Sequence, residues 1–157
     1  MRKRSPPTAA GNCLVIGYGN TLRGDDGAGP RAAEAVAALA LPGVHTLACA
    51  QLSPEHAEPI AQASVAIFVD AAVDAGGEVQ LRKLEPADTS QLMAHAADPR
   101  TMLALARDVF GRAPAAWLVT IPVETLAFRE ALSPVAQRGL EQAVRAIQEL
   151  CRSAHRS

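Results

Sequence analysis

The sequence predicts an α/β protein, a three-layer α/β/α sandwich with a mostly parallel, twisted sheet of about five strands. Apolar runs that suit buried strands alternate along the chain with alanine-rich segments that suit helices, and this alternation is typical of helices packed on a parallel sheet. Hydrophobic residues make up 49% of the 157 residues but aromatic residues only 3%. The core should therefore be built from alanine, leucine and valine.

The expected elements follow one another without an internal repeat. Strands are expected at 13–17, 44–50, 65–69, 78–84 and 116–121, and helices at 29–41, 54–63, 99–110 and 134 to about 151. The continuous apolar run 65–69 is the pattern of a strand buried on both faces, whereas 78–84 alternates like an edge strand. Ser133 and Pro134 suit the N-cap and first position of the last helix.

These elements form one predicted domain at residues 12–151, with a flexible tail at 1–11 and a frayed end at 152–157. The formal net charge of −1 gives no reason to expect a nucleic-acid or membrane partner. The N-terminal apolar stretch is too short for a signal peptide or a membrane span. A cytoplasmic protein is therefore expected.

The three cysteines, Cys13, Cys49 and Cys151, lie far apart in the sequence and form no C-x-x-C pair. This spacing supports neither a zinc site nor a disulfide framework. We expect the three side chains to be small buried hydrophobic groups.

The turn after the first strand carries two glycines and then two adjacent acids, Asp25 and Asp26. A dinucleotide fingerprint needs a third glycine where Leu22 stands, and a P-loop needs a lysine after Gly24, so nucleotide binding is disfavoured. The acids either cap the following helix or hold a cation. We expect Asp25 to cap the turn of residues 24–29 and Asp26 to face a cleft.

A third acid, Asp70, ends the apolar run 65–69, at the carboxyl edge where open α/β sheets bind ligands. It could instead accept only local N–H bonds. His95, in the loop before the helix at 99–110, is the best placed histidine. Two carboxylates and one imidazole suit a transition metal and leave coordination positions open, and we expect Asp26, Asp70 and His95 to converge in one cleft. Neither a zinc-protease H-E-x-x-H nor a G-x-S-x-G nucleophile motif is present.

An ordered set of motifs resembles the nickel–iron hydrogenase maturation endopeptidases. The set consists of GYGN at 17–20, DDGAG at 25–29, QLSPE at 51–55, FVDA at 68–71, His95, DP at 98–99, LALA at 103–106 and LSP at 132–134. The resemblance covers nearly the whole domain.

The resemblance implies that Asp26, Asp70 and His95 are the catalytic and metal-recognising residues. Some members have Glu at the first position, and an Asp reaches less far. The implied reaction removes a C-terminal extension from the precursor of the hydrogenase large subunit after nickel insertion. The implied nickel is delivered by that precursor rather than held by the free enzyme. The segment around Gln51 lacks a glycine-rich run that some members carry, so the partner hydrogenase is left open.

Two alternatives remain at this point. One is a stand-alone metal-dependent peptidase or amidohydrolase, which needs a tightly held metal and further ligands. The other is a non-catalytic chaperone for metalloprotein maturation that uses the same acids only to inspect the metal. The metal content of the purified protein distinguishes the first alternative, because a processing enzyme should have an essentially empty site. Incubation with a nickel-loaded precursor distinguishes the second, because a chaperone would not shorten it.

Overall fold

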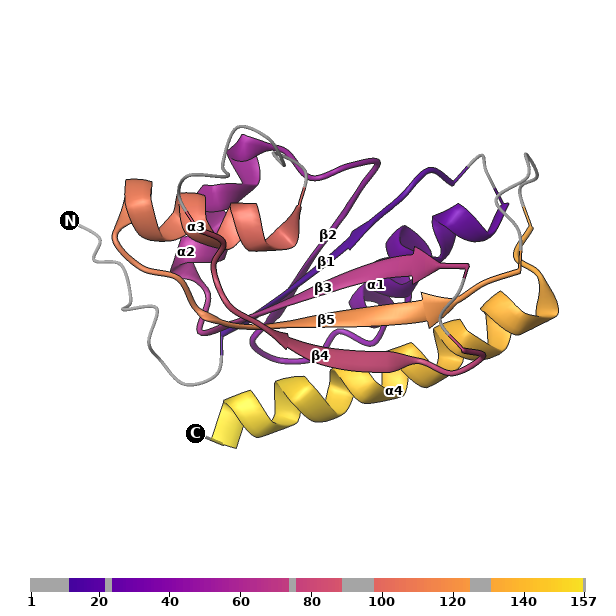
Figure 1. Cartoon of the computed structure of the whole chain (residues 1–157). Coiled ribbons are helices and arrows are strands. Elements are labelled where there is room, and N and C mark those ends of the chain that lie inside the picture. Colours follow the sequence, from indigo (N-terminus) through magenta and orange to yellow (C-terminus); the bar gives the residue numbers. More distant parts are fainter. Residues whose placement is uncertain (1–11, 22–23, 74–75, 89–97, 125–130, 157) are drawn as a thin grey trace.

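The computed structural model describes residues 12–21, 24–73, 76–88, 98–124 and 131–156. In chain order, its elements are β1 (Cys13–Tyr18), the short 3₁₀ helix η1 (Gly24–Gly27), α1 (Ala28–Ala38), β2 (Val44–Cys49), the 3₁₀ turn η2 (Pro54–His56), α2 (Ala57–Gln62), β3 (Val65–Ala72), β4 (Gln80–Leu84), α3 (Pro99–Phe110), β5 (Ala115–Pro122) and α4 (Pro134–Arg156). Figure 1 shows their arrangement.

The five strands form one sheet in the order β2-β1-β3-β5-β4. Neighbouring strands run parallel from β2 to β5, whereas β4 runs antiparallel to β5. The prediction of a mostly parallel five-stranded sheet is therefore confirmed. The segment with alternating polarity forms the edge strand β4, as predicted, although its first four residues are all exposed and only Leu84 is buried.

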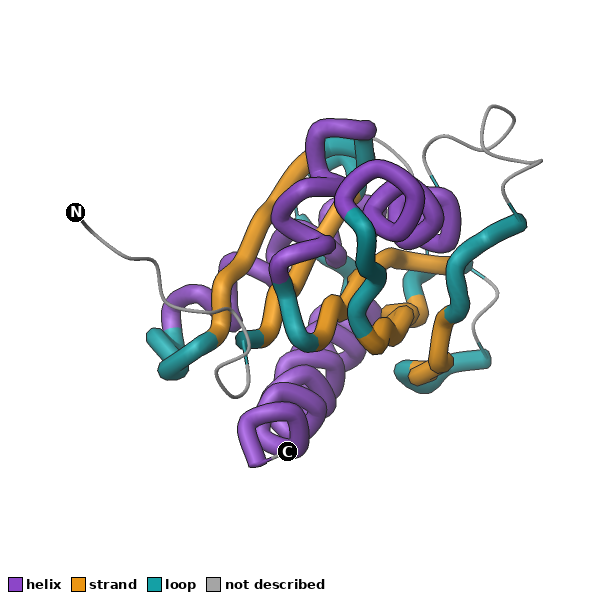
Figure 2. The backbone as a smooth tube through the Cα atoms, turned by 90° about the vertical axis from the view of Figure 1, so that its left-hand side faces the viewer, coloured by secondary structure: helices purple, strands orange, loops and turns teal. Residues whose placement is uncertain are grey.

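Successive residues of the central strands enter two separate hydrophobic clusters. Val15 of β1 and Ile67 of β3 pack with residues of α1 and α4, whereas Ile16 and Phe68 pack with residues of α2 and α3. This division follows from the two-residue period of a strand, which sends neighbouring side chains to opposite faces. Figure 2 shows the strands lying between α4 and the helices of the other side.

Two elements extend by three or more residues beyond their predicted ends. β3 continues to Ala72 because β5 runs beside it, so that Asp70 pairs in register with Thr120 and lies within the strand. α4 continues to Arg156, beyond the end predicted near Cys151 and through most of the segment predicted to fray. The predicted tail at 1–11 lies outside the described residues.

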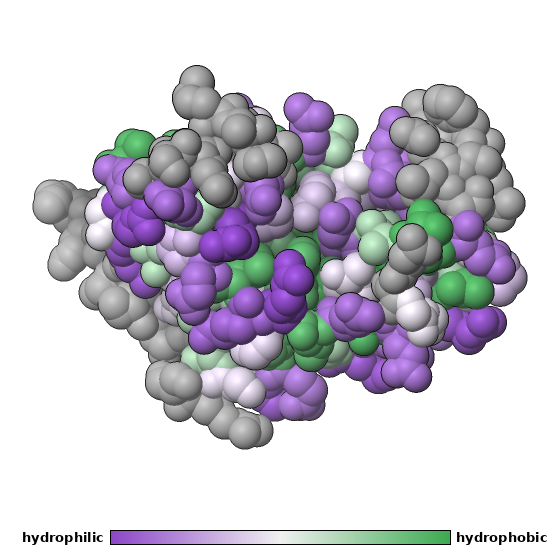
Figure 3. All heavy atoms as spheres, viewed as in Figure 1, coloured by the Kyte–Doolittle hydropathy of each residue, from purple (hydrophilic) through white to green (hydrophobic). Residues whose placement is uncertain are grey.

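The surface mixes polar and apolar side chains. On the face drawn in Figure 3, hydrophobic residues form small groups among hydrophilic ones. The large exposed hydrophobic side chains among the described residues include Val73, Leu81 and Phe110. None of the helices that the structure describes has the length and apolar character needed to cross a membrane.

Candidate active site

Close backbone contacts fix the turn that carries the two adjacent acids. A Cβ atom on Gly17 would lie 2.0 Å from the carbonyl oxygen of Gly29, and a Cβ atom on Gly29 would lie 2.5 Å from the carbonyl oxygen of Val69. Only glycine allows such an approach of backbone to backbone. The start of α1 therefore packs directly against the carboxyl ends of β1 and β3. This contact places η1 beside the strand that carries Asp70.

Asp25 is fully buried and ties this turn to the C-terminal part of the chain. Its carboxylate accepts the N–H of Glu124 at 2.8 Å and both the N–H and the hydroxyl of Ser133, at 2.8 and 2.7 Å. The Ser133 hydroxyl oxygen also accepts the N–H of Ala136 at 3.1 Å, which confirms it as the cap of α4. A buried charge surrounded by donors is an anchoring group.

The prediction that Asp25 caps its own turn is not supported by these contacts. The N-cap of α1 is Gly27, and no side chain caps that helix. The hydrogen bonds to Asp25 instead come from Glu124 and Ser133, which lie 99 and 108 positions away in the sequence. The sequence could not reveal this role because the donors come from distant loops.

Asp26 is only half-buried and serves the turn itself. Its Oδ2 atom accepts the N–H of Asn20 at 2.9 Å, which closes the loop between β1 and η1. A carboxylate has two oxygens with several lone pairs. This bond therefore orients the carboxylate and leaves it capacity for a further ligand.

Asp70 lies half-buried near the end of β3, where its Oδ1 atom accepts the N–H of Ala71 at 2.7 Å. Burial raises the pKa of Asp70 above its usual value, and the negative charge of Asp26 raises it further. Hydrogen bonds from Ala71 and from the Tyr18 phenol act in the opposite direction. The charge of Asp26 is the smallest of these effects on the pKa of Asp70. The alternative of local N–H acceptance thus holds in part, since Ala71 is one of several partners.

Tyr18, the single tyrosine of the chain, is a site residue that the sequence analysis did not identify. It ends β1 and hydrogen-bonds to Asp70. Its own pKa is raised, chiefly by burial and then by the charge of Asp70. The only available signal was its position beside Gly17 at a strand end, which does not distinguish a site residue from a core residue.

The position of His95 lies outside the described residues, so its convergence with the two acids stays a prediction. Among the residues that the structure does describe, no group of three or more His, Cys, Asp and Glu side chains could hold a metal ion. Asp98 is described, and its Oδ1 atom accepts the N–H of Arg100 at 2.8 Å as the N-cap of α3. The charge of Asp98 is one of the smaller effects that raise the pKa of Tyr18.

A cavity of about 330 Å³ adjoins the acidic turn. It lies between the loop after β1 and the end of β2, and its lining includes Asn20, Thr21, Glu34 and Ala48. Asn20 is also the residue whose N–H holds Asp26. The cavity therefore provides concave space beside one of the two acids.

Three solved structures show the same fold over most of the chain. The hydrogenase maturating endopeptidase HybD from E. coli superposes with a TM-score of 0.70 at 21% identity, covering 90% of this chain and 93% of that chain. A hydrogenase 2 maturation peptidase from a Thaumarchaeota archaeon superposes with a TM-score of 0.67 at 25% identity. The match covers 88% of this chain and 97% of that chain. The [NiFe] hydrogenase maturation protease HycI from Thermococcus kodakarensis superposes with a TM-score of 0.70 at 21% identity. The match covers 94% of this chain and 96% of that chain.

The chain matches no protein-family model, and no curated protein matches its sequence. The structural likeness confirms the resemblance that the ordered motifs indicated.

Proposed function

We propose that this chain, which has the fold of the hydrogenase maturation endopeptidases, is itself an endopeptidase of that kind. Its substrate would be a nickel–iron hydrogenase large-subunit precursor, from which it removes the C-terminal extension after nickel insertion. The observation that carries this proposal is the likeness in fold to these proteins over about nine tenths of the chain, together with the position of Asp70 near the carboxyl end of β3. Open α/β sheets bind their ligands at this edge.

The two acids differ from ordinary surface carboxylates in how they are held. Backbone N–H groups of Asn20 and Ala71 orient them, and the Tyr18 phenol adds a bond to Asp70. Two carboxylates at one edge of the sheet offer several oxygen atoms to a cation. The arrangement would therefore suit recognition of a metal that the substrate carries.

We assign His95 as the third ligand to that nickel. Its loop ends at Asp98, whose charge reaches Tyr18, and Tyr18 is bonded to Asp70. Only Ala96 and Ala97 lie between His95 and Asp98, which is a short span of chain. This nearness supports a loop that delivers the imidazole to the same edge.

The cavity between the loop after β1 and the end of β2 would receive the peptide next to the scissile bond. Glu34 and Asn20 supply polar groups at its wall. The substrate's nickel would polarise the scissile carbonyl or lower the pKa of a bound water. The residues of this chain then bind and orient the precursor so that its own metal lies beside the bond to be cut.

The test is incubation of the purified chain with a nickel-loaded large-subunit precursor, followed by electrophoresis and intact-mass measurement. The expected result is a single shortened product with wild type and no product with Asp26→Asn or Asp70→Asn. Asp108→Asn is the matched control because Asp108 is exposed and, within the part of the chain that the structure describes, bonds to its neighbour Arg107. Full processing by both acid variants would refute the proposal, and an unshortened precursor with wild type would favour a maturation chaperone.

A further inference from the structure

Cys13 and Cys151 form a close pair of free thiols at the opposite edge of the sheet from the acids. Their sulfur atoms lie 2.7 Å apart although the residues are 138 positions apart in the sequence. Both are buried, with 0% and 4% of their surface exposed. Cys13 begins β1, and Cys151 lies in the C-terminal part of α4. The expectation of buried cysteines is confirmed for these two, but their side-by-side position was not predicted.

A small cavity reaches one member of the pair. It has a volume of about 170 Å³ and is lined by Leu41, Pro42, Val44, Gln148, Cys151 and Arg152. The lining includes Cys151 but not Cys13. A small oxidant that enters this cavity therefore meets Cys151 first.

The two thiols share one hydrogen bond, in which either sulfur could be the donor. Burial raises the pKa of both thiols. The thiolate is the nucleophilic form of cysteine, and a hydrogen bond from the other thiol stabilises whichever one ionises. Because Cys151 lines the cavity and Cys13 does not, access assigns the role of first nucleophile to Cys151.

We propose that Cys13 and Cys151 are a site of reversible oxidation by hydrogen peroxide, closing to a disulfide that joins the start of β1 to α4. The Cys151 thiolate attacks one peroxide oxygen, the O–O bond breaks, and hydroxide leaves and takes up a proton to form water. The product is a sulfenic acid on Cys151. The Cys13 sulfur then attacks the Cys151 sulfur, and the sulfenic oxygen leaves as a second water with the Cys13 proton. Two thiols and one peroxide give one disulfide and two waters.

The position of the pair predicts what the disulfide does. Sulfur atoms in a disulfide lie about 2.05 Å apart, so the pair needs to close by less than an ångström. The bond would close nearly the whole domain into one covalent loop. Such a loop lowers the conformational entropy of the unfolded chain and so stabilises the folded one. Cys13 pairs in register with Val44 and Val65, the first residues of β2 and β3, so the bond lies at the amino edge of the sheet. It should therefore stabilise the fold without entering the acidic site.

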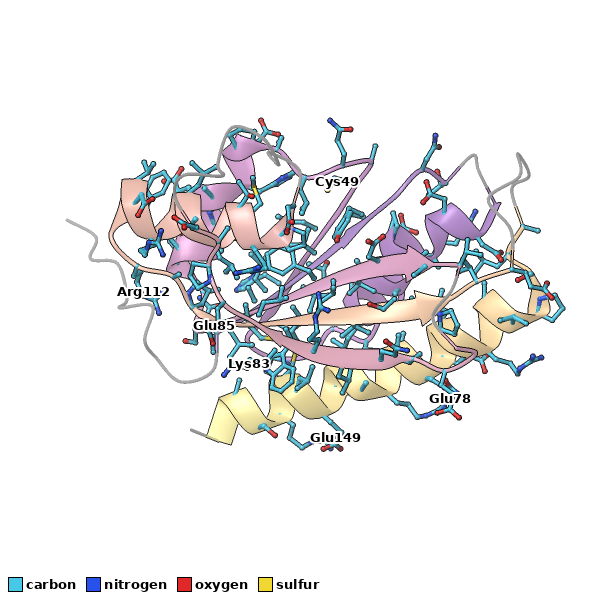
Figure 4. All side chains as sticks on the ribbon, viewed as in Figure 1. Cys49, Glu78, Lys83, Glu85, Arg112 and Glu149 are labelled. Carbon is cyan, nitrogen blue, oxygen red and sulfur yellow. The ribbon has the colours of Figure 1, made fainter. Side chains whose placement is uncertain are left out.

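Cys49 is the matched control within the same chain. It ends β2 and packs against the cluster formed with α2 and α3. It is only partly buried, so the expectation of a buried side chain is not met for Cys49, and it lines the cavity of about 330 Å³ near the acidic turn. Burial and the charge of Glu55 raise its pKa. Figure 4 shows it on the other side of the molecule from Glu149, which marks the part of α4 that carries Cys151. It should neither form the disulfide nor replace either partner.

The test treats the full chain with sub-millimolar hydrogen peroxide and maps its thiols by alkylation and peptide mass spectrometry. Wild type and Cys49→Ala should each lose about 2 Da and give a Cys13–Cys151 cross-linked peptide, reversed by dithiothreitol. The melting temperature should rise by roughly 5 to 15 °C on oxidation. Cys13→Ala should stop at a sulfenic acid that dimedone traps on Cys151, and Cys151→Ala should form no internal disulfide.

Either of two results would overturn the proposal. One is a wild-type chain that keeps both thiols after peroxide treatment under conditions that oxidise the same chain in urea. The other is a disulfide that uses Cys49. The wild-type peptide map decides the matter even if a core variant fails to fold.

Discussion

Two adjacent acids of one turn have opposite environments. Asp25 is fully buried and accepts three hydrogen bonds from Glu124 and Ser133. Asp26 is half-buried, bonds to Asn20 and interacts electrostatically with Asp70. The internal donors around Asp25 let its charge stabilise the fold, whereas Asp26 and Asp70 keep partly exposed carboxylates. The difference separates an anchoring region around Asp25 from the proposed binding region at Asp26 and Asp70.

The largest expected effect is on processing by Asp70→Asn. The amide keeps the shape of the side chain but removes the charge that a substrate-borne cation needs. We expect precursor cleavage to fall by at least about 100-fold, with little change in melting temperature. Single-turnover assays with Asp108→Asn as control measure this effect. If the variant kept more than half of the wild-type rate, Asp70 would not be part of the proposed binding region.

The next largest effect is on stability by Asp25→Ala. The substitution leaves the buried N–H and hydroxyl of Ser133 and the partly buried N–H of Glu124 without their acceptor, and we expect the free energy of unfolding to fall by about 3 to 5 kcal/mol. Asp26→Ala, which loses one bond at a half-exposed position, should cost no more than about 1 kcal/mol. Urea denaturation of the two variants measures the difference. Equal losses would mean that the two acids do not differ in role.

Tyr18→Phe should shift the pH dependence of processing. The phenol donates to Asp70 and lowers the pKa of that carboxyl, so its loss raises the pKa further. The ionised form of Asp70 then appears only at higher pH, and the acidic limb of the rate profile should move upward. Rates at the alkaline plateau should fall by no more than about 10-fold. An unchanged acidic limb would show that Tyr18 does not position or tune Asp70.

The smallest effect is on the pH dependence of stability. The folded-state pKa of Asp70 is raised, chiefly by burial, so the folded protein holds this proton more tightly than the unfolded chain. Its contribution is therefore most favourable below the unfolded pKa of about 3.9 and is lost as the pH rises through the folded value. The Asp70→Asn variant has no carboxyl group to ionise at this position, so its stability does not fall in this way as the pH rises. The variant should gain stability relative to wild type between pH 4 and 7, and a constant difference across that range would contradict the assignment.

The sequence predicted the regular parts of this molecule because their signals are local. The helix at Pro99–Phe110 was predicted at its observed bounds, and Ser133 was predicted as a cap from its position before Pro134. The partners of Asp25 were not predictable, since the donors lie about 100 residues away. The role of Tyr18 was not predicted for the same reason, because its bond to Asp70 depends on the pairing of β1 with β3.

The most direct test of the central claim is to compare nickel-loaded with nickel-free precursor, each mixed with metal-stripped enzyme. Two half-buried carboxylates and one imidazole are too few and too hard as ligands to hold nickel as firmly as a thiolate-rich site, so the metal should come with the substrate. We expect cleavage of the loaded precursor and no cleavage of the nickel-free one. Equal cleavage of both would contradict substrate-delivered nickel and favour a stand-alone peptidase.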